Sequence, residues 1–301
     1  MIGFPPCKIN VGLRILRKRA DGYHDLETLF YPIPLRDALE ILPAETVALH
    51  ITGAGVPGDP STNLCLRAHS LLATDFASIR PVDIHLHKHI PTGAGLGGGS
   101  SDGAYTLLLL NRLFRLGLSR EDLLPYAARL GSDCPFFLYE GPCFASGRGE
   151  ILQPAEVDLS GYQLVLVNPG IHVPTAWAFA QLGLDARAAA PQGLEDAAGA
   201  ERRGEGVGGA DGPLGRAAGA TPGGAKVVPP IATWKDVFRN DFEPAVFNAY
   251  PEVAKIKDTL YARGAVYASM SGSGSTVYGI FKEEAPVVRG DFPAHYWVGR
   301  V

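Results

Sequence analysis

Pro91-Thr92-Gly93-Ala94-Gly95-Leu96-Gly97-Gly98-Gly99-Ser100-Ser101 carries the strongest structural signal in this chain, because it joins a strand pattern to a helix pattern. Its glycines can adopt positive φ and bring the backbone close to a ligand. The apolar run at 102–116 predicts a helix, with Ser100, Ser101 and Asp102 as N-cap residue types. Free N–H groups and the positive helix end would then meet at one spot, which predicts a phosphate site. A flexible linker is disfavoured between two periodic segments.

Two known phosphate-binding loops can be compared with this run. A Walker loop requires a Gly-Lys dipeptide, and the chain contains none. Gly93, Gly95 and Gly98 fit the dinucleotide spacing G-x-G-x-x-G, which also needs an acidic residue about 20 positions later, at a strand end. Glu121 is near that distance but lies in a helix-start pattern. A Rossmann-type dehydrogenase and a non-catalytic nucleotide-binding module therefore remain as alternatives to an ATP-using enzyme.

Composition limits the class of protein. The chain has 301 residues, 46% of them hydrophobic and 19% charged, which predicts an ordinary globular protein of about two domains. A net charge of -4 argues against nucleic acid as a partner. No apolar run approaches the roughly 18 residues needed to span a membrane, and the N-terminus lacks a secretory signal. The scattered cysteines form no C-x-x-C pair, so we expect buried thiols in a cytoplasmic protein: Cys7, Cys65, Cys134 and Cys143.

Hydrophobic periodicity predicts an α/β protein. The expected strands are 9–16, 38–42, 47–51, 82–90, 144–145 and 161–168, with two more in 266–281. The expected helices are 63–74, 102–116 and 120–130, with helical stretches in 236–262. We expect an N-terminal domain at 1–153 and a C-terminal domain at 154–301. Within the second, 184–230 is rich in Ala, Gly and Pro without aromatic residues, which predicts a largely disordered insertion.

Three histidines alternate along the strand at 82–90. His85, His87 and His89 would lie on one face, opposite an apolar face. Imidazoles are common metal ligands, but this set would still need a closing ligand. We favour a solvent-facing polar strand face, and the sequence assigns no protein ligand to a metal.

Other polar residues stand at special positions. Lys8 and Asn10 share one face of the first strand, where a lysine is costly unless paired, although an exposed edge lysine is the alternative. Asp133 follows a helix-ending glycine, where a turn-capping role is the simpler interpretation. The small-residue run at 272–275 could line a phosphate or substrate, or form a tight hairpin.

The order of these motifs resembles the GHMP small-molecule kinases. The chain carries Pro-x-Lys-x-Asn at 6–10, Gly-Tyr-His at 22–24, the glycine run at 91–101, Gly-Ser-Asp-Cys-Pro-Phe-Phe at 131–137 and Ser-Gly-Ser-Gly-Ser at 271–275. The resemblance covers nearly the whole chain apart from 184–230. It implies a two-domain α/β (α+β) fold with mixed or antiparallel sheets and an active site in the interdomain cleft. Within the family it is most similar to members that phosphorylate the 2-hydroxyl of a cytidine-diphosphate-linked methylerythritol in non-mevalonate isoprenoid synthesis.

The resemblance also implies the site residues. Asp133 would accept the hydroxyl proton, and Lys8 would orient Asp133 and stabilise oxyanion charge. ATP would be cradled by Pro91, Thr92, Gly93, Ala94, Gly95, Leu96, Gly97, Gly98, Gly99, Ser100 and Ser101. The cytidine would stack between Tyr23 and Phe179, or Trp177 as a fallback, with Asn10, His24 and Thr175 near it.

Cofactors and partners follow from the same resemblance. We expect ATP with Mg²⁺, for which Ser101 is only a candidate ligand. The expected partner is a small-molecule substrate with a cytidine diphosphate moiety, with no nucleic acid and no membrane. We expect a monomer or weak homodimer.

Overall fold

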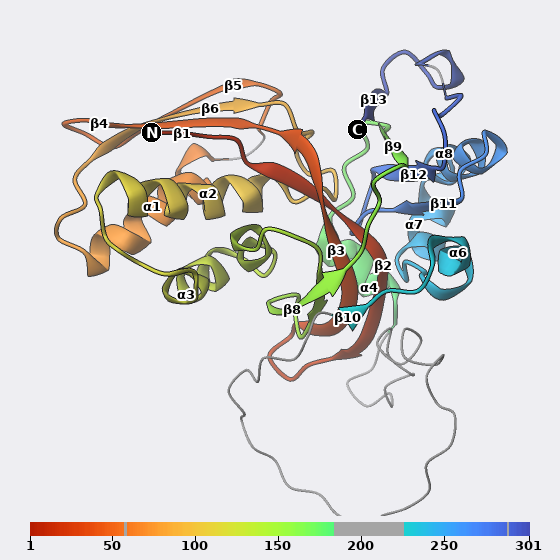
Figure 1. Cartoon of the computed structure of the whole chain (residues 1–301), viewed down its shortest axis with the longest axis horizontal. Coiled ribbons are helices and arrows are strands. Elements are labelled where there is room, and N and C mark those ends of the chain that lie inside the picture. Colours follow the sequence, from red (N-terminus) through yellow and green to blue (C-terminus); the bar gives the residue numbers. More distant parts are fainter. Residues whose placement is uncertain (57–58, 184–225, 288) are drawn as a thin grey trace, which may run out of the picture.

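Two long antiparallel strands, β2 (Pro6–Lys18) and β3 (His24–Arg36), run through the middle of the molecule and join its two halves (Figure 1). The computed structural model describes residues 1–56, 59–183, 226–287 and 289–301. The pair belongs to a five-stranded sheet of order β10-β8-β7-β3-β2. Its other strands are β7 (Cys143–Ser146), β8 (Ile151–Glu156) and β10 (Lys226–Val227).

The N-terminal half adds a four-stranded sheet of order β1-β4-β6-β5, with helices beneath one face (Figure 1). Asn63 caps the first helix through its side chain, and Ser119 and Asp122 form a capping box on the third. The strands are β1 (Ile2–Gly3), β4 (Ala38–Pro43), β5 (Ala48–Gly53) and β6 (Val82–Lys88). The helices are α1 (Leu64–Asp75), α2 (Gly98–Leu113) and α3 (Arg120–Leu130), with 3-10 turns η1 (Pro60–Thr62) and η2 (Cys134–Leu138).

The C-terminal half contains a four-stranded sheet of order β11-β12-β9-β13, packed with helices (Figure 1). Its strands are β9 (Gln163–Asn168), β11 (Tyr267–Met270), β12 (Val277–Phe281) and β13 (Trp297–Arg300). The helices are α4 (Thr175–Gln181), α6 (Trp234–Val237), α7 (Glu243–Ala249) and α8 (Pro251–Ala262), with 3-10 turns η4 (Ile231–Thr233) and η5 (Arg289–Asp291).

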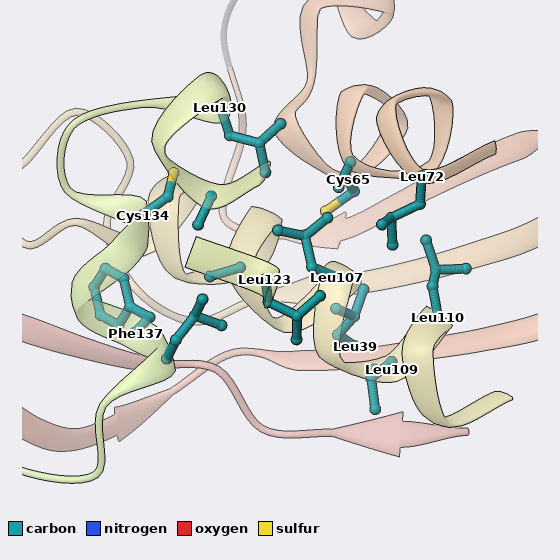
Figure 2. Packing of buried hydrophobic residues seen from close by; sticks show 14 of the residues in the cluster. Leu39, Cys65, Leu72, Leu107, Leu109, Leu110, Leu123, Leu130, Cys134 and Phe137 are labelled. Carbon is teal, nitrogen blue, oxygen red and sulfur yellow. The ribbon is translucent and has the colours of Figure 1, made fainter. Parts of the chain in front are cut away.

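The first hydrophobic core lies between the N-terminal sheet and its helices. Figure 2 shows side chains from α1, α2 and α3 converging on Leu39 of β4. Burying such aliphatic side chains contributes roughly 1.5–3 kcal/mol each, which holds the start of α2 in place. The labelled members of the cluster are Leu39, Cys65, Leu72, Leu107, Leu109, Leu110, Leu123, Leu130, Cys134 and Phe137.

The α/β class and most elements are as the sequence predicts, and all four cysteines are free and buried. The strands of the described residues pair mainly antiparallel. A Rossmann fold has a mostly parallel sheet, so the Rossmann-type alternative is wrong. No helix in these parts of the chain could cross a bilayer.

Two expectations about the elements need correction. The helix after the glycine run begins at Gly98 and not near Asp102, because Gly97 turns the chain in the left-handed conformation. Strand β3 is missing from the sequence interpretation, since Pro32 and Pro34 argue against a strand. These prolines are tolerated because β7 pairs with β3 only at 28–30.

The expected domain boundary and the expected insertion can be located on the structure. The boundary between 1–153 and 154–301 falls inside β8, which pairs with β7. The expected insertion at 184–230 falls outside the described residues up to position 225. Its last five residues are ordered, because β10 pairs in parallel with β8 and Trp234 Nε1 donates a hydrogen bond to the Pro229 carbonyl oxygen.

Candidate active site

A cleft of about 920 Å³ lies where β2, β3, the glycine run and α4 approach one another. The residues before η2 and the loop between β11 and β12 complete its wall. Its lining brings together residues that are far apart in the sequence. The predicted site residues that line it are Lys8, Asn10, Tyr23, His24, Gly93, Gly95, Gly97, Asp133, Thr175 and Phe179.

The remaining members of the glycine run do not line this cleft. Ala94 and Leu96 point into the core with 3% and 1% of their surface exposed, and Ser101 is fully buried. The run therefore faces the cleft through alternate glycines, while its apolar side chains anchor it to the core. The residues set back from the cleft are Pro91, Thr92, Ala94, Leu96, Gly98, Gly99, Ser100 and Ser101.

Lys8 is a buried cation at the back of the cleft. Its ammonium group donates a hydrogen bond to Asn10 Oδ1 at 2.6 Å and lies 3.3 Å from Asp133 Oδ2. It also sits 4.8 Å from the centre of the Phe30 ring. These partners compensate the cost of burying the charge. The alternative of an exposed edge lysine is wrong, because Lys8 is only 3% exposed.

Asp133 lies between α3 and η2, and its carboxylate opens toward the cleft with 36% of the side chain exposed. Its side chain makes no capping hydrogen bond to η2, so the turn-capping interpretation is not observed. Burial raises the pKa of the neighbouring Cys134 thiol to about 12, which excludes it as a thiolate nucleophile. The Asp133 carboxylate, paired with Lys8, is therefore accessible to a ligand in the cleft.

Asn10 connects the lysine to two loops. Its amide nitrogen Nδ2 donates to Thr28 Oγ1 at 3.1 Å, and its backbone N–H donates to Ser271 Oγ at 3.2 Å. Ser271 Oγ in turn donates to the Gly95 carbonyl oxygen at 2.8 Å. The network fixes Lys8 relative to both the glycine run and the loop between β11 and β12. Sequence reasoning singled out this second loop but missed the linking role of Ser271.

The glycine run brings Gly97, at the start of α2, next to Lys8. Gly97 is the N-cap of α2 at φ +70°, and no side chain caps this helix. The N–H groups of its first turn are therefore available to an anion. A Cβ atom on Gly97 would lie 3.0 Å from Lys8 Cε, so only glycine lets the loop pack against the lysine.

A buried charge cluster supports the start of α2. Lys88 Nζ pairs with Asp37 and lies 2.7 Å from Asp102 Oδ2. Asp37 also accepts hydrogen bonds from the backbone N–H groups of His89 and Ile90. Burial raises the pKa of the Asp102 carboxyl to about 7, opposed by Lys88 and assisted by Asp37.

Sequence reasoning missed this cluster, although the alternation of β6 contained the signal. Positions 82, 84 and 86 face the core, and the same period places Lys88 on the core face. A lysine continuing an apolar face predicts a buried partner of opposite charge.

An aromatic pair forms the far side of the cleft. The His24 and Phe179 rings stack with centroids 4.3 Å apart and an interplanar angle of 13°. Partial burial lowers the pKa of the His24 imidazole, with a further contribution from Lys18, which favours the neutral ring. Thr175 Oγ1 is 3.0 Å from Ser273 Oγ at the same wall.

Tyr23 is 54% exposed, and the Arg148 guanidinium lies 4.8 Å from its ring centre. At this exposure the Tyr23 ring does not cover the edge of the hydrophobic core. Trp177 packs edge-on against Tyr250 and does not line the cleft.

Two further cationic side chains line the cleft, and sequence reasoning suggested neither of them. Lys18 ends β2, and Arg148 lies in the turn between β7 and β8. Together with Lys8 they outnumber the one carboxylate that lines the cleft, Asp133, which favours an anionic ligand. The turn Gly147-Arg148-Gly149 is the only sequence signal for Arg148, and it is weak.

Comparisons with known proteins agree with this geometry. Residues 63–141 match the family model described as the GHMP kinases N terminal domain, and residues 231–296 match the GHMP kinases C terminal model. A 4-diphosphocytidyl-2-C-methyl-D-erythritol kinase of Bacteroides fragilis is 45% identical over 98% of this chain and 97% of its own length.

Solved structures give the same result. A crystal structure of 4-(cytidine 5'-diphospho)-2C-methyl-D-erythritol kinase superposes with a TM-score of 0.71 at 30% identity, covering 100% of this chain and 98% of the other. Homoserine kinase from Cytophaga hutchinsonii has a TM-score of 0.66 at 15% identity, covering 100% and 92% of the two chains. The second similarity concerns the fold alone.

Proposed function

The chain belongs to the 4-diphosphocytidyl-2-C-methyl-D-erythritol kinases of the GHMP family, and we propose that it transfers the γ-phosphoryl group of ATP to the 2-hydroxyl of that substrate. The product would serve non-mevalonate isoprenoid precursor synthesis. The observation that carries the proposal is the 3.3 Å contact between Lys8 Nζ and Asp133 Oδ2, placed beside the glycine run in a large cleft.

The chemistry requires little more than positioning and charge stabilisation. The substrate hydroxyl would give its proton to the Asp133 carboxylate as its oxygen bonds to the γ-phosphorus. The bond from that phosphorus to the β,γ-bridging oxygen would break, and ADP would leave. Lys8 would hold Asp133 in place and stabilise negative charge on the attacking oxygen. In the loose transition state of phosphoryl transfer, such alignment supplies much of the rate enhancement.

The uncapped start of α2 supports the glycine run as the ATP phosphate site. Mg²⁺ would neutralise phosphate charge when bound with the nucleotide. The local donors suit a hard cation, because the Ser101 hydroxyl is buried without a hydrogen-bond partner among the described residues and Asp133 offers carboxylate oxygens. Neither residue is assigned as a magnesium ligand.

The cytidine end of the substrate would lie near Tyr23, His24 and Phe179. Each side chain lines the cleft, and a base could stack on the exposed Tyr23 ring or replace His24 against Phe179. Asn10 and Thr175 would contribute polar contacts, and Lys18 and Arg148 would face the diphosphate. This arrangement extends the substrate from the aromatic wall to Asp133.

The division into two domains stays part of the proposal, with the boundary moved past β8. It would fall between Glu156 and Gln163, in the segment between the family matches at 63–141 and 231–296. A cytoplasmic location is supported by four free, buried cysteines, which suit a reducing compartment. The oligomeric state, a monomer or a weak homodimer, remains a prediction.

A coupled assay that follows ADP release tests the function. We expect ADP release with both ATP and 4-diphosphocytidyl-2-C-methyl-D-erythritol present, and little without the second substrate. Asp133→Asn should abolish most turnover while ATP still binds. A non-catalytic nucleotide-binding module would bind ATP and give no substrate-dependent ADP.

A further inference from the structure

Three side chains that could ligate a metal cluster on the face of the N-terminal sheet opposite its buried core face. The helices α1 and α2 cover the buried face of this sheet (Figure 1). His50 on β5 and His85 on β6 are register partners across the parallel pair. Asp83 lies two residues before His85 and so shares its face of β6. None of the three lines the active-site cleft.

The donor atoms of this cluster, His50, Asp83 and His85, converge. His50 Nε2 lies 2.8 Å from Asp83 Oδ1, and His85 Nε2 lies 3.3 Å from Asp83 Oδ2. All three ligand atoms are within 4.8 Å of one another. The two imidazoles stack with centroids 4.8 Å apart and an interplanar angle of 17°, so both rings present Nε2 to one carboxylate.

The carboxylate is not fully satisfied by the histidines. Asp83 Oδ1 is buried and has no hydrogen-bond partner among the described residues, although His50 Nε2 is close by. The short approach therefore lacks hydrogen-bond geometry. An unpaired carboxylate oxygen beside two imidazole nitrogens is a donor set that a cation can complete.

We propose that this cluster binds a divalent transition-metal ion, typified by Zn²⁺, through His50, Asp83 and His85. Two imidazoles and one carboxylate are ligands of zinc sites that keep a fourth position for water or another donor. Imidazole nitrogen suits Zn²⁺, Cu²⁺ and Ni²⁺, whereas Mg²⁺ prefers oxygen ligands. The ion that accompanies ATP is therefore not the expected occupant.

The neighbours of the cluster define its limits. Glu40 on β4 is the register partner of His85 and shares the outward face, but it is not among the donors that lie within 4.8 Å of one another. His87 Nδ1 is 2.9 Å from Thr52 Oγ1 and stands outside the cluster. The sequence interpretation favoured a solvent-facing strand face for His85, His87 and His89 because a closing ligand was lacking, whereas the proposed additional ligands, His50 on β5 and Asp83, lie outside that pattern.

Metal binding would join the edge strand β5 to β6 by side chains as well as by the backbone ladder. A ligand that binds only the folded state stabilises it in proportion to the logarithm of ligand concentration. Zn²⁺ should therefore raise the unfolding temperature independently of ATP and substrate. The proposal does not depend on the kinase function, and either can fail alone.

Calorimetric titration of ZnCl2 into the full-length, tag-free, chelator-treated chain tests the site, without ATP. We expect one equivalent of Zn²⁺ per chain, and an affinity at least about tenfold weaker in His50→Gln and in His85→Gln. His87→Gln is the matched control, since it removes an imidazole from the same face but outside the cluster. It should bind Zn²⁺ like the parent chain.

Two further readouts keep the test decisive. Circular dichroism without metal should be the same for all variants, since the changed side chains are partly exposed. Co²⁺ should give the visible absorption of a nitrogen–oxygen site in the parent and in His87→Gln, and lose it in His50→Gln. Absence of Zn²⁺ binding in the parent, or unchanged affinity in both cluster variants, would overturn the proposal.

Discussion

Lys8 Nζ lies 3.3 Å from Asp133 Oδ2, and the lysine is buried while the carboxylate opens to the cleft. The lysine therefore forms part of the back wall of the cleft, next to the more exposed aspartate. If the two residues act as one unit, their effects on turnover should not add.

Asp133→Asn is expected to lower kcat by roughly 10²–10⁴-fold, because it removes the proton acceptor and keeps the shape. Lys8→Met should lower kcat as well, and the double variant should be little worse than the more damaged single variant. Steady-state kinetics of the three variants, with ATP affinity measured separately, check this. If the fold-losses in kcat of the two single variants multiply in the double variant, Lys8 and Asp133 do not act as a coupled pair.

Gly97→Ala should impair ATP affinity and turnover together, because the new Cβ would meet Lys8 Cε at 3.0 Å and Phe137 Cζ at 3.1 Å. Gly117→Ala is the matched control, since Gly117 has φ +73° against +70° for Gly97 and nothing within 4 Å of its added Cβ. Both variants carry a left-handed strain of roughly 1–2 kcal/mol. Nucleotide titration and kcat should be affected in Gly97→Ala only, and equal behaviour of both variants would argue against the loop as the ATP site.

Tyr23→Ala should raise the KM for the cytidine-linked substrate by about tenfold or more, since stacking of a base on an aromatic ring contributes roughly 1–3 kcal/mol. Phe179→Ala should act in the same direction and also release the His24 ring. The KM for ATP serves as the internal control and should change little. An unchanged substrate KM in both variants would contradict the placement of the cytosine base at this wall of the cleft.

Stability should respond to pH through Asp102. Its carboxyl has an ordinary pKa of 3.8 that burial raises to about 7, so the folded state binds more protons than the unfolded state between these values. The contribution of Asp102 to the free energy of unfolding should therefore fall as pH rises from about 4 to 7 and stay constant above. Urea unfolding across this range should show a smaller decline for Asp102→Asn than for the parent chain. Parallel curves for the two proteins would contradict the assignment.

Much of the site could be predicted from local sequence because its residues lie in short, ordered motifs. Lys8 and Asp133 lie in such motifs, and the glycine run predicts the start of a helix. The His24–Phe179 stack could not be predicted, because it depends on how β3 and α4 approach across the cleft. The same holds for Ser271, whose partners are more than a hundred positions away in the sequence.

Three other features differ from the sequence interpretation, each for its own physical reason. Lys88 follows the apolar face of β6, but its partners Asp37 and Asp102 come from two other segments, so the sequence shows only one charge at a time. β3 was missed because its prolines are tolerated only where β7 does not pair. The helix α2 begins at Gly98, earlier than predicted, because the left-handed turn at Gly97 outweighs the preference for serine or aspartate as N-cap residues.

The central claim is phosphoryl transfer to the 2-hydroxyl of 4-diphosphocytidyl-2-C-methyl-D-erythritol. Phosphorus-31 NMR of the purified chain with ATP, Mg²⁺ and this substrate measures it directly. We predict one ADP for each new phosphomonoester at the 2-position, and much slower reaction with the uridine analogue, because polar groups matched to cytosine would be left unpaired. No phosphomonoester, or equal rates with mevalonate or the uridine analogue, would contradict the account.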